Sequence, residues 1–197
     1  MPAARESLLD AAYTALQRRS WSTVRMVDVA AVAGVSRQTL YNEFGSKDGL
    51  ARALVRRETD AYLAGADRAL AEGGLPRLAE WTVAAARTNA LIRAVLTGCW
   101  GPRLPAPPLS AIPSTSPVPA QRRADGALPS PADVVAVVRD RAVATRIAPG
   151  AVRNETLRAH QECELALRLA LSCVIAPLGE GGVGQLVREA LGVTSTP

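Results

Sequence analysis

The chain has 197 residues, which fits one ordinary domain or a small domain joined to a larger one. Apolar residues make up 48% of the sequence and charged residues 21%, a balance that is typical of globular proteins and argues against wholesale disorder. The formal net charge is +5, and residues 1–57 hold nine basic and five acidic side chains, so the positive excess lies at the N-terminal end, as expected for binding to an anionic partner.

Membrane, metal and catalytic functions find little support in the composition. No apolar run reaches the roughly 20 residues that span a bilayer, and the first residues lack the form of a signal peptide, so we expect a cytoplasmic protein without a membrane partner. Cys99, Cys163 and Cys173 form no CxxC pair and His160 is the only histidine, so we expect no metal site and no cofactor. The same shortage leaves no recognisable nucleophile–base pair, which makes an enzyme the less favoured alternative.

Abundant alanine and scarce aromatic residues favour helices over sheet. Apolar residues recur at helical spacing over residues 4–19, at Leu9, Ala12, Tyr13 and Leu16. The sequence therefore predicts an all-α fold of about nine helices.

Two short helices follow the first one. We expect Val24–Ala33 to be helical, with Thr23 as its N-cap and Gly34 directly after its end. Ser36 is the expected N-cap of the next helix, which runs to Phe44. Two short helices joined by a turn that contains glycine form a helix-turn-helix unit, although such a pair can also serve packing alone.

The second of these helices has an outward face that suits nucleic acid. Val35, Leu40 and Phe44 are expected to pack inward. A helix with polar and basic outward residues can enter the major groove by its N-terminal half. The outward residues that can hydrogen-bond to base edges or phosphates are Ser36, Arg37, Gln38, Thr39, Tyr41 and Asn42.

The rest of the chain contains further predicted helices and one proline-rich segment. A helix that starts after Ser46 is expected to reach about residue 71, and residues 76–97 hold one or two helices, divided near Asn89. Nine prolines between residues 98 and 131 predict a long exposed loop there. Pro131 can open the next helix, which ends near residue 148, and the last two helices cover residues 151–176 and the region around Leu186 and Leu191.

The run from Ser22 to Leu50 resembles the TetR family of bacterial transcriptional repressors. The resemblance covers roughly residues 5–55 and rests on Ala-Gly-Val-Ser at 33–36, Leu40-Tyr41, Phe44, Ser46-Lys47 and Leu50. It implies an N-terminal helix-turn-helix DNA-binding domain at residues 1–50 and a C-terminal ligand-binding and dimerisation domain at residues 51–197.

The resemblance also implies individual DNA contacts. Thr23 and Tyr41 correspond to phosphate contacts, and Lys47 to the cation that pins the DNA backbone. Arg37, Gln38 and Thr39 correspond to positions that read bases, with a phosphate or water-mediated contact as the alternative for each. Glu43 departs from the family's pattern, because a carboxylate is repelled by phosphate, and we expect it to point away from DNA or to pair with a nearby arginine.

In this family the C-terminal helices hold an effector pocket, here expected among residues 60–150. Mostly apolar lining predicts a hydrophobic effector held by one or two polar groups, although each lining residue can instead belong to the core. Residues 91–101 and the proline-rich loop resemble, more weakly, actinobacterial members whose effectors are fatty acids or long-chain lipids. The candidate lining residues are Trp81, Leu91, Val95, Leu96, Trp100, Leu104, Val134, Val138 and Arg141.

The last two helices carry apolar stripes that are too broad for one small core, which predicts a homodimer interface; closing the monomer core is the alternative. A two-fold dimer would present two recognition helices to a pseudo-palindromic operator in double-stranded DNA. We therefore expect a repressor that a hydrophobic effector releases, with a regulator or activator that has no effector as the alternative. The candidate interface residues are Leu157, Leu165, Leu169, Cys173, Leu186, Val187 and Ala190.

Overall fold

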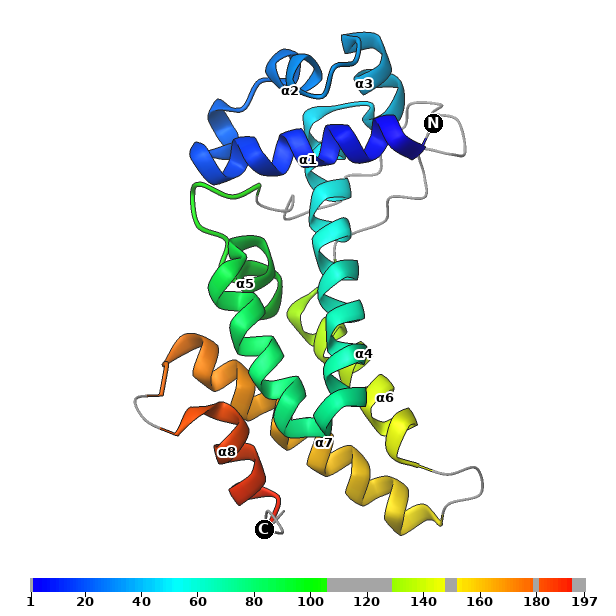
Figure 1. Ribbon diagram of the computed structural model, residues 1–197, viewed down its shortest axis with the longest axis vertical. Coiled ribbons are helices and arrows are strands. Elements are labelled where there is room, and N and C mark those ends of the chain that lie inside the picture. The colour runs from blue at the N-terminus through cyan, green and yellow to red at the C-terminus, as the bar shows by residue number, and fades with distance from the viewer. Residues whose placement is uncertain (1, 106–128, 148–151, 179–180, 193–197) are drawn as a thin grey trace. The chain divides into compact units, whose positions relative to one another are not determined.

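The computed structural model describes residues 2–105, 129–147, 152–178 and 181–192, and within these ranges it is helical and contains no strand. The expected all-α fold is confirmed (Figure 1). The elements in chain order are α1 (Pro2–Arg18), the short 3-10 helix η1 (Trp21–Thr23), α2 (Met26–Val32), α3 (Arg37–Phe44), α4 (Lys47–Thr88), α5 (Ala90–Thr97), α6 (Pro131–Arg146), α7 (Arg153–Ile175) and α8 (Gly182–Ala190).

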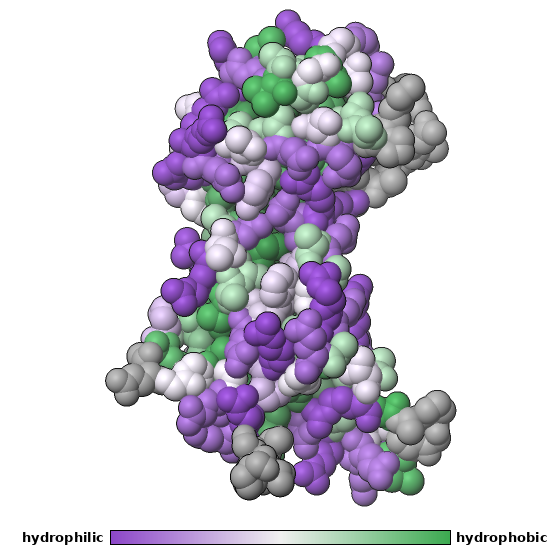
Figure 2. Space-filling model, in the orientation of Figure 1, coloured by the Kyte–Doolittle hydropathy of each residue, from purple (hydrophilic) through white to green (hydrophobic). Residues whose placement is uncertain are grey.

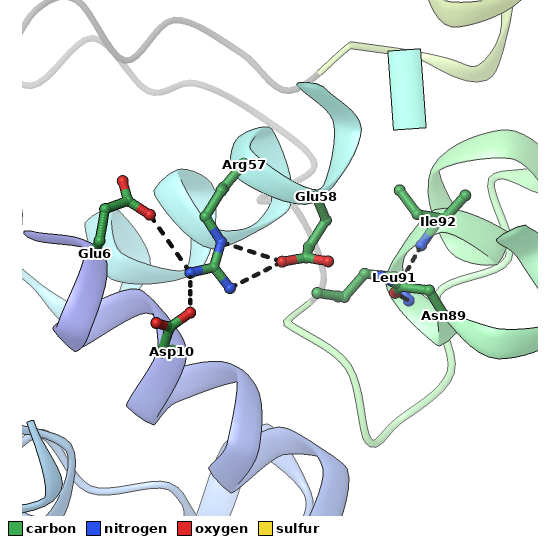
Figure 3. Close-up of polar contacts among 7 residues, drawn as sticks. All are labelled: Glu6, Asp10, Arg57, Glu58, Asn89, Leu91 and Ile92. Carbon is green, nitrogen blue, oxygen red and sulfur yellow. Dashed lines mark hydrogen bonds and ion pairs between the residues drawn. The ribbon is translucent and has the colours of Figure 1, made fainter. Parts of the chain in front are cut away.

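Helix α4 contains the break that the sequence predicted. Gly73 and Gly74 have non-helical backbone angles, so α4 consists of two helical parts joined by a kink. Counting the two parts separately gives the expected number of helices within the described residues. The division near Asn89 is also present, because the Asn89 side chain accepts hydrogen bonds from the backbone N–H groups of Leu91 and Ile92 at the start of α5 (Figure 3).

The described residues form two compact units. The first comprises residues 2–58 and 100–105, and the second comprises residues 59–99, 129–147, 152–178 and 181–192. The first unit thus extends past residue 50, and α4 contributes residues to both units. Of the predicted proline-rich loop, residues 106–128 lie outside the described residues.

The first unit packs α1, α2, α3 and the start of α4 around a shared apolar core. Leu8, Leu40 and Leu54, one each from α1, α3 and α4, are completely buried. Arg57 of α4 fixes α1 from the side: its guanidinium lies 2.7 Å from the Asp10 carboxylate and 3.7 Å from that of Glu6, and it also pairs with Glu58 (Figure 3). These contacts join α1 to the start of α4 within the first unit.

In the second unit, the two parts of α4 pack against one another. The indole of Trp81 lies where a side chain at position 65 would stand, so that a Cβ on Gly65 would be 2.1 Å from the ring. The Trp81 Nε1–H donates to the Tyr62 carbonyl, and the Tyr62 and Thr82 hydroxyls share a buried hydrogen bond of 3.1 Å. Within the described residues, no helix combines the length and the apolar character that crossing a membrane requires.

Candidate nucleic-acid interface

The turn between α2 and α3 is a short glycine turn closed by backbone hydrogen bonds. The Val35 N–H donates to the Ala30 carbonyl, and Gly34 has φ of 68°, a left-handed conformation that L side chains rarely adopt. Ser36 then caps α3 as predicted, since its hydroxyl oxygen accepts from the Thr39 N–H at 3.0 Å. The sequence therefore folds these residues as a helix-turn-helix pair.

The outward face of α3 consists of the predicted polar residues. Leu40 and Phe44 are buried, and Val35 is half-buried, so the apolar side of the helix faces the core. Thr39 is half-buried, and Arg37 forms no ion pair with any described residue, which leaves its guanidinium available to an anion. The exposed members of the predicted set are Ser36, Arg37, Gln38, Tyr41 and Asn42.

Hydrogen bonds between neighbouring side chains order this face. The Ser36 and Thr39 hydroxyls lie 2.9 Å apart, and Gln38 Nε2 donates to Asn42 Oδ1 at 2.8 Å. A glutamine amide has a second N–H and a carbonyl oxygen, so Gln38 can keep its bond to Asn42 and still offer a donor and an acceptor to adenine. The face thus keeps its internal order while Gln38 retains hydrogen-bonding groups for a further partner.

Besides the polar face of α3, the candidate DNA-binding surface includes Lys47 and η1. The Lys47 ammonium donates to the Ser22 carbonyl at 3.0 Å and lies 5.6 Å from the centroid of the Trp21 ring. Burial lowers the pKa of Lys47, and the nearby Asp48 carboxylate acts in the opposite direction. Lys47 is therefore attached to the turn that carries Thr23.

The expectation that Thr23 caps α2 is wrong. Arg25 occupies the N-cap position of α2 without a side-chain cap, because η1 lies between α1 and α2 and takes up Thr23 as its last residue. The Thr23 hydroxyl donates to the Ser20 carbonyl at 2.8 Å. A phosphate oxygen can only accept, so a phosphate contact requires this hydroxyl to turn from Ser20 to the DNA.

Glu43 pairs with an arginine, as expected. Its carboxylate lies 3.8 Å from the guanidinium of Arg5, which itself stacks over the ring of Phe44 at 4.8 Å. The cation of α1 thus offsets the one acidic side chain of α3. The sequence pattern did not identify Arg5 as the partner, since residues 38 positions apart are brought together only by packing.

The candidate pocket residues do not lie in one unit. Leu91, Val95, Leu96, Val134 and Val138 are buried in the second unit. Trp81 is half-buried there, and Arg141 is exposed and pairs with Asp67 at 2.7 Å. Trp100 and Leu104 belong to the first unit.

The candidate interface residues differ in exposure. Leu157 and Leu165 are 56% and 41% exposed, whereas Cys173 and Val187 are buried within the second unit and so contribute to its core. Ala190 is exposed, and Leu169 and Leu186 are half-buried. Ile175, at the end of α7, is 74% exposed, and Figure 2 shows hydrophobic side chains at the surface around α6 and α7.

The geometry of the first unit defines the class of protein. A short helix, a glycine turn and a second helix with an ordered polar face form a helix-turn-helix module, the arrangement by which many proteins read DNA. The comparisons with known proteins agree with this class. Residues 8–54 match the family model of the bacterial regulatory proteins of the tetR family.

One relative and two solved structures describe the similarity further. A 56-residue segment, 28% of this chain, is 52% identical to the HTH-type transcriptional regulator AlkX of Mycobacterium tuberculosis, and the match spans about a quarter (26%) of that relative's length. A tetR-family transcriptional regulator from Streptomyces coelicolor has TM-score 0.54 and 18% identity, with 97% of this chain and 78% of that chain covered. The TetR family repressor AlkX from Dietzia sp., implicated in the biodegradation of n-alkanes, has TM-score 0.49 and 20% identity over 95% of this chain and 93% of that chain. The similarity to the tetR family of bacterial regulatory proteins is thus shown for the N-terminal quarter of the chain, at residues 8–54.

Proposed function

We propose that the protein binds duplex DNA sequence-specifically as a homodimer and represses transcription until a hydrophobic, fatty-acid-like effector releases it. The DNA-binding part of this proposal rests on two observations. Side-chain hydrogen bonds order the polar face of α3, and Lys47 binds the Ser22 carbonyl in η1. On this proposal Arg37, Gln38 and Thr39 contact bases. Ser36, Tyr41 and Asn42 contact bases or phosphates, and Thr23 and Lys47 hold the DNA backbone.

The exposed leucines of α7 support the homodimer. Leu157 and Leu165 are large apolar side chains that remain 56% and 41% exposed, and burying them in an isologous contact would remove this surface from water. A two-fold dimer would then place two copies of α3 on a pseudo-palindromic site.

The buried apolar residues of α5 and α6 support a hydrophobic effector. Leu91, Leu96 and Val138 are buried aliphatic side chains of the second unit, and side chains of this kind suit contact with a long hydrocarbon. The alternative is a regulator or activator that acts without an effector.

The test of the DNA-binding dimer is selection of a duplex from a random-sequence pool by the full chain, followed by sedimentation of the complex. The selected sequences are expected to have two-fold symmetry, with two protomers on each duplex. Leu165→Glu should give monomers that bind the duplex weakly, because a charge would then be buried in the interface. Val137→Glu is the matched control, since Val137 has the same 41% exposure as Leu165 and lies outside the candidate interface. A selection that yields no common sequence would contradict the proposal.

A further inference from the structure

The segment directly after α5 forms a β-turn that belongs to the first unit. The Leu104 N–H donates to the Gly101 carbonyl at 3.0 Å, and Pro102 occupies the second position of the turn, where its fixed φ is favourable. The sequence had assigned these residues to the effector half of the chain. In the structure they pack with residues 2–58, and Pro105 is buried there.

This turn supplies a hydrogen-bond acceptor that η1 lacks. The Trp21 N–H donates to the Arg103 carbonyl at 2.8 Å. Trp21 is the first residue of η1 and is 6% exposed, and the first N–H groups of a helix have no acceptor within that helix. Without the Arg103 carbonyl a buried N–H would remain unpaired, which is unfavourable. Figure 1 shows this green segment running beside the connection between α1 and α2.

The turn therefore holds one side of η1, and Lys47 holds the other. Lys47 binds the Ser22 carbonyl, so η1 is fixed at two successive residues by two distant parts of the chain. A three-residue 3-10 helix has little stability of its own. The position of Thr23, the last residue of η1, consequently depends on both contacts.

We propose that the turn at residues 101–104 is a positioning element for DNA binding, which fixes Thr23 at its phosphate contact by holding the Trp21 amide through the Arg103 carbonyl. This inference rests on the proposed DNA-binding function. It assigns the role to the main chain of Arg103. The Arg103 side chain is exposed and has no partner among the described residues, and its charge is not required.

Leu104→Pro tests the proposal because it removes the N–H that closes the turn and drives Arg103 out of the turn conformation. The probe is the duplex selected by the wild-type protein, in a titration at several salt concentrations. We expect about tenfold weaker binding, the size of one lost hydrogen bond to a charged group, with an unchanged salt slope because no cationic contact is lost. In a Thr23→Val variant, Leu104→Pro should lower the affinity for the duplex little further, since the phosphate contact of Thr23 is already absent.

A second variant covers the case in which Leu104→Pro fails to fold, as judged by its helical circular dichroism. Pro102→Gly only loosens the turn and should weaken binding in the same way but less. Pro129→Gly, which alters a proline in the second unit, is the matched control and should bind like the wild type.

Three results would overturn the inference while leaving the proposed function intact. The first is wild-type affinity in folded Leu104→Pro or Pro102→Gly. The second is a full additive loss on combining Leu104→Pro with Thr23→Val. The third is a lower salt slope in Arg103→Ala, by about 0.9 for one phosphate, which would mean that the guanidinium binds DNA directly. A wild-type protein that binds no duplex would instead refute the proposed function itself.

Discussion

Lys47 is the only lysine of the chain, and its ammonium group donates to the carbonyl of Ser22, the neighbour of the proposed phosphate contact Thr23. An ammonium group has three N–H donors, so Lys47 can bind the Ser22 carbonyl and a phosphate together. Lys47→Ala is expected to weaken binding to all duplexes similarly and to lower the slope of log affinity against log salt concentration by about 0.9.

Gln38→Ala should also relax base preference. The free energy of binding by which the preferred base is favoured over the others should fall by roughly 1–3 kcal/mol.

These two variants are compared by fluorescence titration on the selected duplex and on a scrambled one. Arg93→Ala, an exposed residue of the second unit, is the control for the loss of one positive charge. If Gln38→Ala lowers affinity for both duplexes equally, Gln38 does not read a base.

The ion pair of Arg5 and Glu43 predicts a compensating pair of substitutions. Arg5→Ala removes the cation that offsets the carboxylate on α3, so binding to every duplex should weaken through repulsion of phosphate. Adding Glu43→Gln should restore most of the affinity, because the repelling charge is then gone. Titration of the single and double variants at low salt measures the coupling, and a double variant weaker than Arg5→Ala would contradict this role.

At the scale of single residues, the cap of α3 could be predicted from the sequence, whereas the start of α2 and the distant partners could not. Ser36 could be predicted as an N-cap because its preference arises from the three residues that follow it. Thr23 carries the same signal, but η1 displaced it from the cap, and a single 3-10 turn leaves no periodic pattern in a sequence. Arg5 and Arg103 were missed as partners because their contacts depend on tertiary packing.

At the scale of elements, the contact between the two parts of α4 predicts that position 65 tolerates only glycine. Gly65→Ala places a methyl group 2.1 Å from the Trp81 ring, so the ring must move and the buried contacts around Tyr62 loosen. Overpacking of this kind lowers the free energy of unfolding by about 1–3 kcal/mol, which exceeds the stabilisation that a helix gains from alanine in place of glycine.

Urea unfolding of the full chain measures this loss of stability. A leucine at position 81 is smaller than the indole that faces position 65. Gly65→Ala should therefore lower the free energy of unfolding much less in a Trp81→Leu variant than in the wild type. Equal losses in both backgrounds would show that the indole is not the obstacle.

Element boundaries followed from the sequence wherever a residue forces them. Pro131 begins α6 after the Ser130 cap, and the glycines at 73 and 74 interrupt α4. The assignment of residues 101–104 to the first unit did not follow, since a Gly-Pro pair predicts a turn but carries no information about the surface on which the turn packs.

At the scale of the whole molecule, the proposed switch requires an effector that binds one state better than the other. The first part of α4 begins with Lys47 and has residues in both units, so an effector that displaces this part of α4 would also displace Lys47. A coupling of 1–3 kcal/mol is typical and would weaken operator binding roughly 5- to 150-fold. Fatty acids of graded chain length are the probes for this switch, titrated by calorimetry and in parallel by release of the selected duplex.

We expect fatty-acid affinity to rise by roughly fourfold for each added methylene until the available space is filled, because burying one methylene contributes about 0.8 kcal/mol. Arg141 is the charged member of the candidate lining set, and it can bind a fatty acid by exchanging the Asp67 carboxylate for that of the ligand. Arg141→Gln should then weaken the binding of fatty acids while leaving that of the corresponding alcohols unchanged. Release of DNA should follow the same order of chain lengths as binding. Binding without a dependence on chain length, or binding without release, would refute the fatty-acid effector and leave the DNA-binding assignment standing, because the contacts of α3 and η1 do not depend on the ligand.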